Sequence, residues 1–229
     1  MESLAQMTRM IRSGSLSGIP SKPAKIAHAG HSFGSTQTYA LTAKYPHISD
    51  GIILTGFSTK KEYLSYFIAG SNFVQFKTDR DCQLNGMPQP VHSNSYELGY
   101  LSSDDVGNTE YLFFYPDHFD VDILYYAELH KQPVTPGELL TVSSLPKMSS
   151  FAGPVLVVTG DHDLPFCGGD CYNTGGKAPT ILAEAAKAFP SASSFTTYPV
   201  PNSGHGINLH YTSVDAYNKI MDWLAKMGF

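Results

Sequence analysis

The chain has 229 residues, of which 42% are hydrophobic and 15% are charged. This balance is typical of a globular domain with a sizeable core and excludes an intrinsically disordered chain. The formal net charge of −5 at pH 7 gives no electrostatic reason to expect nucleic acid or an anionic membrane as a partner. No uncharged apolar run is long enough to predict a membrane span.

The N-terminal segment predicts an amphipathic helix over residues 1–12, because Leu4, Met7 and Ile11 recur at helical spacing. This pattern is not that of a secretory signal peptide, which needs a longer uncharged apolar stretch. Residues 13–23 are rich in Gly, Ser and Pro and predict a linker.

The next segment contains the strongest motif of the chain. The short run 24–29 precedes Gly30-His31-Ser32-Phe33-Gly34, which fits the G-x-S-x-G turn between a strand and a helix. We expect a strand at 24–29, a helix at 33–45 and a second strand at 51–57. The two glycines are expected to remove Cβ atoms where the turn is crowded, and Ser32 to hold a strained backbone conformation.

Residues 58–151 differ in texture from the segments on either side. They contain most of the aromatic clusters, broken by Asn, Gly and Pro, and predict helices at about 60–69 and 121–130. An insertion of this length between two strands is uncommon unless it folds over something. The sequence therefore predicts a core made of residues 1–57 and 152–229, with residues 58–151 forming a lid or a helical subdomain with its own aromatic core.

The sheet pattern resumes after Pro154. The branched apolar run 155–159 suits a strand that is buried on both faces. A helix at 179–189, a strand at 194–200 and an amphipathic helix at about 214–227 complete the pattern. Alternating strands and helices predict the α/β class with a parallel sheet and right-handed crossovers.

The run 24–29 followed by Gly30-His31-Ser32-Phe33-Gly34-Ser35 resembles the elbow of the α/β-hydrolase family. It is most similar to the lid-bearing, esterase- or lipase-like members that are common in fungi. The resemblance covers nearly the whole chain, but it begins in the middle of the family's fold. It implies a parallel sheet flanked by helices, a mostly helical lid insertion, and a serine hydrolase that needs no cofactor.

A serine hydroxyl is a weak nucleophile at neutral pH, so it needs an adjacent base and an acid that orients that base. The family's chain order is Ser, acid, His. We expect Ser32 to be the nucleophile and His205, between two glycines after the last strand, to be the base. The resemblance places the acid three residues after the strand-ending Gly160, at Asp163. Asp161 is the alternative acid, although its carboxylate could instead cap the turn.

Three other histidines are given structural or lining roles. His31 beside the serine could line the site, with its side chain pointing away from the hydroxyl, and His162 is expected to pack locally. His210 is expected to be structural. Asp50 and Asp170 have no feature that favours them as the acid.

The backbone N–H of Phe33 is the expected first oxyanion donor. The family's second donor comes from a loop after an earlier strand, and no such strand precedes Ala24 in this sequence. We therefore expect the chain to be the C-terminal portion of a longer hydrolase. The strand at Ala24–Ala29 would then lie at a sheet edge, where unpaired backbone groups could pair with another chain.

Three cysteines are present. Cys167 and Cys171 are close enough for a disulfide in a glycine-rich loop, with two free thiols as the alternative, and Cys82 is left over. A disulfide would favour secretion of the full-length form, but this chain shows no signal peptide. No second pair of ligands stands at zinc spacing, so no metal site is predicted.

The leading hypothesis is a serine hydrolase that cleaves a small carboxylic ester with an apolar part. A peptidase, a thioesterase or an acyltransferase would use the same three residues with a different pocket. The alternative from another class is a non-catalytic module that binds an apolar ligand, or a partner chain through the exposed edge.

Overall fold

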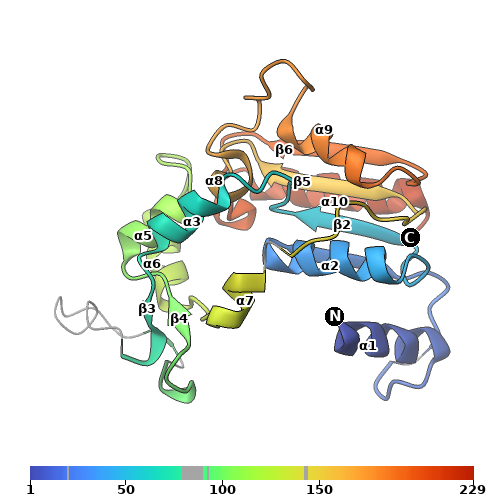
Figure 1. Ribbon diagram of the computed structural model, residues 1–229, viewed down its shortest axis with the longest axis horizontal. Coiled ribbons are helices and arrows are strands. Elements are labelled where there is room, and N and C mark those ends of the chain that lie inside the picture. The colour runs from blue at the N-terminus through green and yellow to red at the C-terminus, as the bar shows by residue number, and fades with distance from the viewer. Residues whose placement is uncertain (20, 79–89, 92, 142–143) are drawn as a thin grey trace.

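The computed structural model describes residues 1–19, 21–78, 90–91, 93–141 and 144–229 (Figure 1). Cys82 lies outside the described residues. The described chain consists of a sheet with helices on both faces, and of a mostly helical insertion beyond one end of the sheet (Figure 1).

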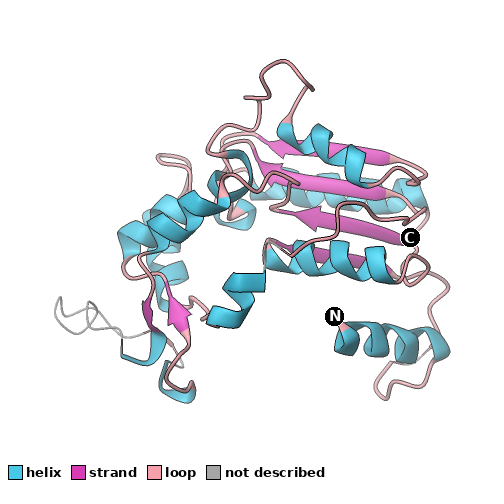
Figure 2. Cartoon of the chain, in the orientation of Figure 1, coloured by secondary structure: helices cyan, strands magenta, loops and turns pink. Residues whose placement is uncertain are grey.

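The main sheet has four parallel strands in the order β1-β2-β5-β6 (Figure 2). The strands are β1 (Ala27–His31), β2 (Gly51–Thr55), β5 (Val155–Gly160) and β6 (Phe195–Val200). β2 and β5 occupy the centre, and every residue of β5 is buried, as a continuous apolar run predicts. The prediction of an α/β fold with a parallel sheet is confirmed.

β1 begins three residues later than the sequence predicted. Both backbone groups of Ile26 bond to Asp50, the residue before β2. The Ile26 N–H donates to the Asp50 carboxylate (2.8 Å), and the Ile26 carbonyl accepts from the Asp50 N–H (2.8 Å). A side chain thus takes the place of a ladder partner, and regular pairing starts with Ala27 opposite Gly51. Within the described sheet β1 is an edge strand.

Two helices cover one face of the sheet and a third covers the other (Figure 1). α2 (Phe33–Lys44) and α9 (Ile181–Glu184) pack on the first face through Tyr39, Ile181 and Leu182. α10 (Ser213–Met227) packs on the second face through Ala216 and Trp223. Burial of these side chains, at about 25 cal/mol per Å² of apolar surface, holds the strand ends in fixed register.

The N-terminal helix α1 (Glu2–Ser13) lies beside α2 and β1. Ala5 packs with Leu41 and Ile48 in a small apolar cluster. Thr8 Oγ1 donates to the Leu4 carbonyl and accepts a hydrogen bond from His28 Nε2 on β1 (2.9 Å). These contacts join the predicted amphipathic helix to the edge of the sheet.

The insertion lies beyond the carboxyl ends of the strands (Figure 1). It contains α3 (Leu64–Ser71), α5 (Val106–Phe113), α6 (Val121–Leu129), α7 (Pro136–Thr141) and a two-stranded hairpin of β3 (Val74–Gln75) and β4 (Leu101–Ser102). Two of these helices were expected from the sequence, near residues 60–69 and 121–130. The hairpin, α5 and α7 were not expected; strands of two residues and a helix of six are too short to show a distinctive periodicity.

Short elements complete the described part of the chain. α8 (Leu164–Cys167) follows β5, and 3₁₀ turns lie at Phe76–Thr78, Ser93–Ser95, Ala185–Ala188 and Ile207–Leu209. No helix of the described ranges combines the length and the apolar character that crossing a bilayer requires.

Asp50 provides a test of how α1 and β1 are fixed. Its Oδ2 accepts from both Arg12 and the Ile26 N–H, at 2.8 Å each. Asp50→Ala leaves a partly buried backbone donor without its partner, so we expect a loss of about 1–2 kcal/mol in the free energy of unfolding. Arg12→Ala removes the ion pair, whose side chains are each 35% exposed, and a hydrogen bond from Arg12 to the Ile48 carbonyl (3.1 Å), but it leaves the Ile26 N–H bonded to Asp50 and should cost at most about 1 kcal/mol. Urea unfolding of both variants measures the difference; an equal effect of the two would contradict this account.

Candidate active site

The turn after β1 holds Ser32 in a strained backbone conformation, as the sequence predicted. Ser32 has φ 53° and ψ −115°, in the positive-φ region that non-glycine residues rarely occupy. Its N–H donates to the Thr55 carbonyl of β2 (2.8 Å), which fixes the turn to the neighbouring strand. α2 begins at Phe33, so the N–H groups of its first turn lie next to the serine and lack intrahelical acceptors.

The two glycines of the motif differ in their roles. A Cβ on Gly30 would lie 2.3 Å from the Gly34 backbone, so the strand and the helix start can approach only because Gly30 has no side chain. A Cβ on Gly34 would meet no described atom within 4 Å. The expectation that both glycines relieve crowding is therefore wrong for Gly34, which faces open space in the described structure.

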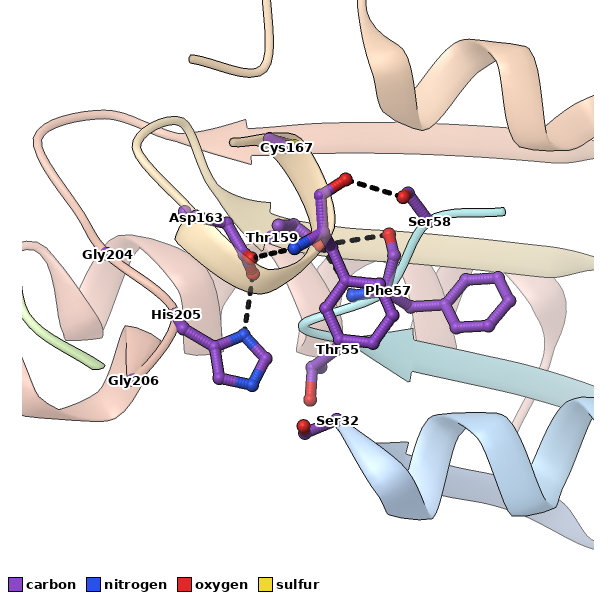
Figure 3. A network of polar contacts seen from close by, with 12 residues as sticks. Ser32, Thr55, Phe57, Ser58, Thr159, Asp163, Cys167, Gly204, His205 and Gly206 are labelled. Carbon is purple, nitrogen blue, oxygen red and sulfur yellow. Dashed lines mark hydrogen bonds and ion pairs between the residues drawn. The ribbon is translucent and has the colours of Figure 1, made fainter. Parts of the chain in front are cut away.

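Asp163 and His205 are brought together from two different strand ends (Figure 3). Asp163 follows β5 and caps α8, with Oδ1 accepting from the Phe166 N–H (2.8 Å). His205 follows β6, and its Nδ1–H donates to Asp163 Oδ2 (2.7 Å). Both side chains are fully buried. The carboxylate therefore fixes the ring's orientation and directs the lone pair of the neutral imidazole to Nε2.

Ser32 lies near the His205–Asp163 pair but is not hydrogen-bonded to it. Figure 3 shows Ser32 at the start of α2 on the side of the His205 ring opposite Asp163. His205 Nε2 is buried and has no hydrogen-bond partner in the described part of the chain, so Ser32 Oγ does not bond to it in this conformation. Catalytic hydrogen bonds in structures without substrate are often long and tighten only when substrate binds.

Asp161, the alternative acid, is not brought to His205. Its Oδ1 accepts from His162 Nδ1 (2.7 Å) and from the Ser203 N–H (3.2 Å), so it ties the end of β5 to the turn after β6. The His162 ring stacks on Tyr115 at 3.6 Å between centroids. The Asp161 carboxylate thus bonds to turn residues, which is the alternative role that the sequence predicted for it.

His31 contacts the candidate base directly. Its ring lies 4.9 Å from the His205 ring, and its Nδ1–H donates to Thr55 Oγ1 (3.0 Å), whose own hydroxyl donates to the Gly30 carbonyl. Surrounding protein atoms lower the pKa of His31 to about 3, and the neighbouring His205 adds to that shift, although the ring keeps contact with solvent. No sequence signal could have shown this pairing, because it depends on how two strand ends approach.

His210 holds the loop that carries His205. Its Nε2 accepts from the N–H groups of Gly204 (3.1 Å) and Tyr115 (2.9 Å), and its Nδ1–H donates to the Gly206 carbonyl (2.9 Å). Only the neutral ring can accept at Nε2. Burial lowers the pKa of His210, which keeps the ring in that form.

An apolar cavity of about 200 Å³ opens beside the serine. It lies between the elbow and the insertion, and its one charged wall residue is Glu138. The lining residues are Ser32, Phe33, Leu64, Phe67, Phe113, Val134, Glu138, Leu139, Pro165 and Phe166. Such a cavity can exclude water from an apolar group held next to Ser32.

Cys167 and Cys171 form a disulfide that closes the loop after Asp163. Both cysteines are buried. No group of three or more His, Cys, Asp or Glu side chains that could hold a metal ion occurs among the described residues.

Gly56 is a site where a small change should disturb the two histidines. It has φ +56°, and a Cβ there would lie 2.7 Å from His205 Cε1 and 2.8 Å from His31 Cε1. Gly56→Ala is expected to displace the His205 and His31 rings and, by overpacking, to lower the free energy of unfolding in urea by about 1–3 kcal/mol. Gly99→Ala, at φ +104° with no described atom within 4 Å, controls for backbone strain alone. Equal effects of the two substitutions would contradict the crowding.

Stability should fall on mild acidification. Burial lowers the folded-state pKa of His28 and of His210 below the usual histidine value of about 6.5. The unfolded chain therefore binds more protons than the folded chain below about pH 6.5. The contribution of these histidines to the free energy of unfolding is complete above that pH and is lost toward lower pH. Urea unfolding between pH 7.5 and pH 5.5 should show a decrease of up to about 1.4 kcal/mol per pH unit for each such histidine. A free energy of unfolding that stays constant or rises would contradict this.

Comparisons with known proteins give structural matches only. No family model and no curated protein sequence matches the chain. A Mycobacterium tuberculosis protein described as a non-heme bromoperoxidase aligns over 99% of this chain and 74% of its own, with a TM-score of 0.56 and 15% identity. A thermophilic esterase from Thermogutta terrifontis aligns over 90% and 66%, with a TM-score of 0.53 and 15% identity.

A monoacylglycerol lipase from Paleococcus ferrophilus aligns over 99% of this chain and 75% of its own, with a TM-score of 0.53 and 12% identity. The chain thus spans from 66% to 75% of the lengths of these three proteins. At such identities the matches show a shared fold. The expected resemblance is confirmed at that level: the chain has the α/β-hydrolase fold.

Proposed function

We propose that this chain is a serine hydrolase that cleaves a carboxylic ester, with Ser32 as nucleophile, His205 as base and Asp163 as the acid that orients it. The observation that carries the proposal is the buried 2.7 Å hydrogen bond between His205 and Asp163, with His205 Nε2 lacking a partner on the side of Ser32. A purely structural histidine would be expected to satisfy both of its ring nitrogens when fully buried. The esterase and lipase among the structural matches support the same reading.

The proposed chemistry proceeds in two halves. Ser32 Oγ attacks the ester carbonyl while its proton passes to His205 Nε2, and the imidazolium is stabilised by Asp163. The alcohol then leaves with that proton, and the acyl group stays on the serine. Water attacks the acyl group with His205 again as base, which releases the acid and restores the serine.

Negative charge on the carbonyl oxygen needs hydrogen-bond donors. The Phe33 N–H at the start of α2 is the proposed first donor, since it follows the serine and the helix N-terminus favours negative charge. Loss of one such donor costs about 10²- to 10³-fold in rate, so the Phe33 N–H is expected to contribute on that scale.

The acid assignment has a matched control in the chain. Asp163→Asn keeps the shape of the side chain but removes the charge that orients His205, and should lower kcat by about 10³-fold or more. Asp161→Asn makes the same change two residues away and should leave kcat within about threefold, because it leaves the bond to His205 intact. Turnover of 4-nitrophenyl butyrate by both variants is the measurement. A larger loss in Asp161→Asn would overturn the assignment.

Substitution of the serine tests the nucleophile. Ser32→Ala should reduce turnover of the same ester to the level of the reaction without protein, since no other group would carry the acyl intermediate. Ser191→Ala, in an exposed turn before β6, should leave turnover of the ester unchanged. Retained turnover in Ser32→Ala would refute the mechanism.

A non-catalytic binding module is the second candidate. It is favoured by the unpaired outer side of β1 in the described sheet. In that case the chain would bind an apolar ligand without turnover, or pair with another chain along β1. Saturable binding of an ester that is never cleaved, or a dimer broken by Ala29→Pro, would support this candidate over the first.

A further inference from the structure

His31, the last residue of β1, is placed by polar contacts and is not part of the core, since the residue is exposed. Its Nδ1–H donates to Thr55 Oγ1 (3.0 Å), and the Thr55 hydroxyl donates to the Gly30 carbonyl (2.9 Å). The one proton of that hydroxyl is thus used, so Thr55 Oγ1 can only accept from His31. The neutral His31 ring therefore carries its proton on Nδ1.

Thr55, the last residue of β2, connects this ring to the turn that holds the serine. Its carbonyl accepts from the Ser32 N–H (2.8 Å) and from Ser35 Oγ (2.7 Å). Its hydroxyl makes the bond to His31. One residue of the neighbouring strand thus fixes both the backbone at the proposed nucleophile and the ring of His31, and a shift of Thr55 would move the two together.

The rings of His31 and His205 converge on the same glycine. Their centroids lie 4.9 Å apart. A Cβ on Gly56 would lie 2.8 Å from His31 Cε1 and 2.7 Å from His205 Cε1, so both Cε1 atoms lie against Gly56. In His205 this atom lies between Nδ1, which bonds to Asp163, and the unpartnered Nε2. The two rings therefore approach each other at the edge of His205 that carries the nitrogens of the proposed mechanism.

The carboxylate bond at Nδ1 does not by itself fix the position of Nε2 in His205. A ring held at one atom can still tilt, because the torsion that turns an imidazole has broad minima. Phe113 and Phe166 stack on the ring, with centroids 5.8 Å and 5.5 Å away. His31 is closer, at 4.9 Å, and belongs to the strand that leads into the serine turn. Among these three contacts, His31 is the one that relates the base to that turn.

The charge of His31 also bears on a neighbour that must accept a proton. Desolvation by surrounding protein atoms lowers the pKa of His31 to about 3, so the ring is neutral near pH 7. A cation at this place would oppose the formation of an imidazolium on His205, because like charges repel. A neutral ring makes the same contact without that penalty.

We propose that His31 is a positioning residue, which holds the His205 ring with Nε2 in reach of Ser32 and is itself held by Thr55. His31 takes no proton in the reaction and touches no reacting atom. The proposal rests on the proposed function for the step at Ser32. The orientation of the His205 ring requires only the contacts of His31, and it can be measured without turnover.

Two substitutions separate the ring of His31 from its polar anchor. His31→Asn keeps an N–H at the place of Nδ1 but removes the ring, and should lower kcat for 4-nitrophenyl butyrate about 10-fold with KM within about twofold. His31→Phe keeps a ring against His205 and should lower kcat only about threefold. His47→Asn, on an exposed turn after α2, is the matched control and should change neither constant.

A residue that only supported the fold would change the free energy of unfolding and not the kcat of the folded protein. An unchanged kcat in His31→Asn, or a loss in His31→Phe as large as in His31→Asn, would therefore overturn the positioning role.

A double-mutant cycle tests the anchor. Thr55→Val removes the hydroxyl, and its effect on kcat should be about threefold larger in the unmodified protein than in His31→Phe, which has already lost the bond to Thr55. The bond to Gly30 is lost in both backgrounds, so it cancels in the ratio. Equal effects in the two backgrounds would overturn the part of Thr55.

The orientation of His205 can be followed in a protein that does not turn over. In Ser32→Ala, the Nδ1–H proton of His205 is held in the bond to Asp163 and should give a downfield ¹H NMR signal. Exchange of this proton with water should become about 10-fold faster when His31→Asn is added and should stay unchanged with His47→Asn.

The NMR and kinetic results together separate this proposal from the proposed function. If exchange behaves as stated but no ester is cleaved, the proposed function fails and the role of His31 in holding the ring stands. If esters are cleaved while His31→Asn alters neither the exchange nor kcat, the positioning role fails alone.

Discussion

The hydrogen bond between Asp163 and His205 is the contact on which the rest of the site depends. It joins the ends of β5 and β6, is fully buried, and is 2.7 Å long. Asp163 is held by its second oxygen at the N-terminus of α8, and His205 by the loop that His210 ties to the chain at Tyr115. A buried carboxylate without this partner would be costly, so the pair also stabilises the junction of the two strands.

The insertion contacts the loop that carries His205. Phe113 lies at the end of α5, and its carbonyl accepts from the Gly206 N–H (2.7 Å). The Phe113 ring stacks on the His205 ring, with centroids 5.8 Å apart. The same ring lines the cavity beside Ser32. A ligand that displaced this ring would therefore act on the position of His205 as well.

Features that depend on local sequence patterns could be predicted from the sequence. Features that depend on contacts between residues far apart in the chain could not. The run 155–159 and the elbow at Ser32 identified two strands, a helix and the fold, because periodicity and glycine spacing are local properties. The late start of β1 depends on a side chain, Asp50, 24 residues from Ile26. The contact of His31 with His205 likewise joins residues distant in sequence.

The most direct test of the central claim is the site of covalent labelling. The protein is treated with a fluorophosphonate, and the phosphonylated peptide is located by mass spectrometry. The account predicts one adduct per chain, on Ser32, formed much more slowly in Asp163→Asn because His205 is then no longer oriented to take the serine's proton. Absence of an adduct, or an adduct on another residue, would contradict the account.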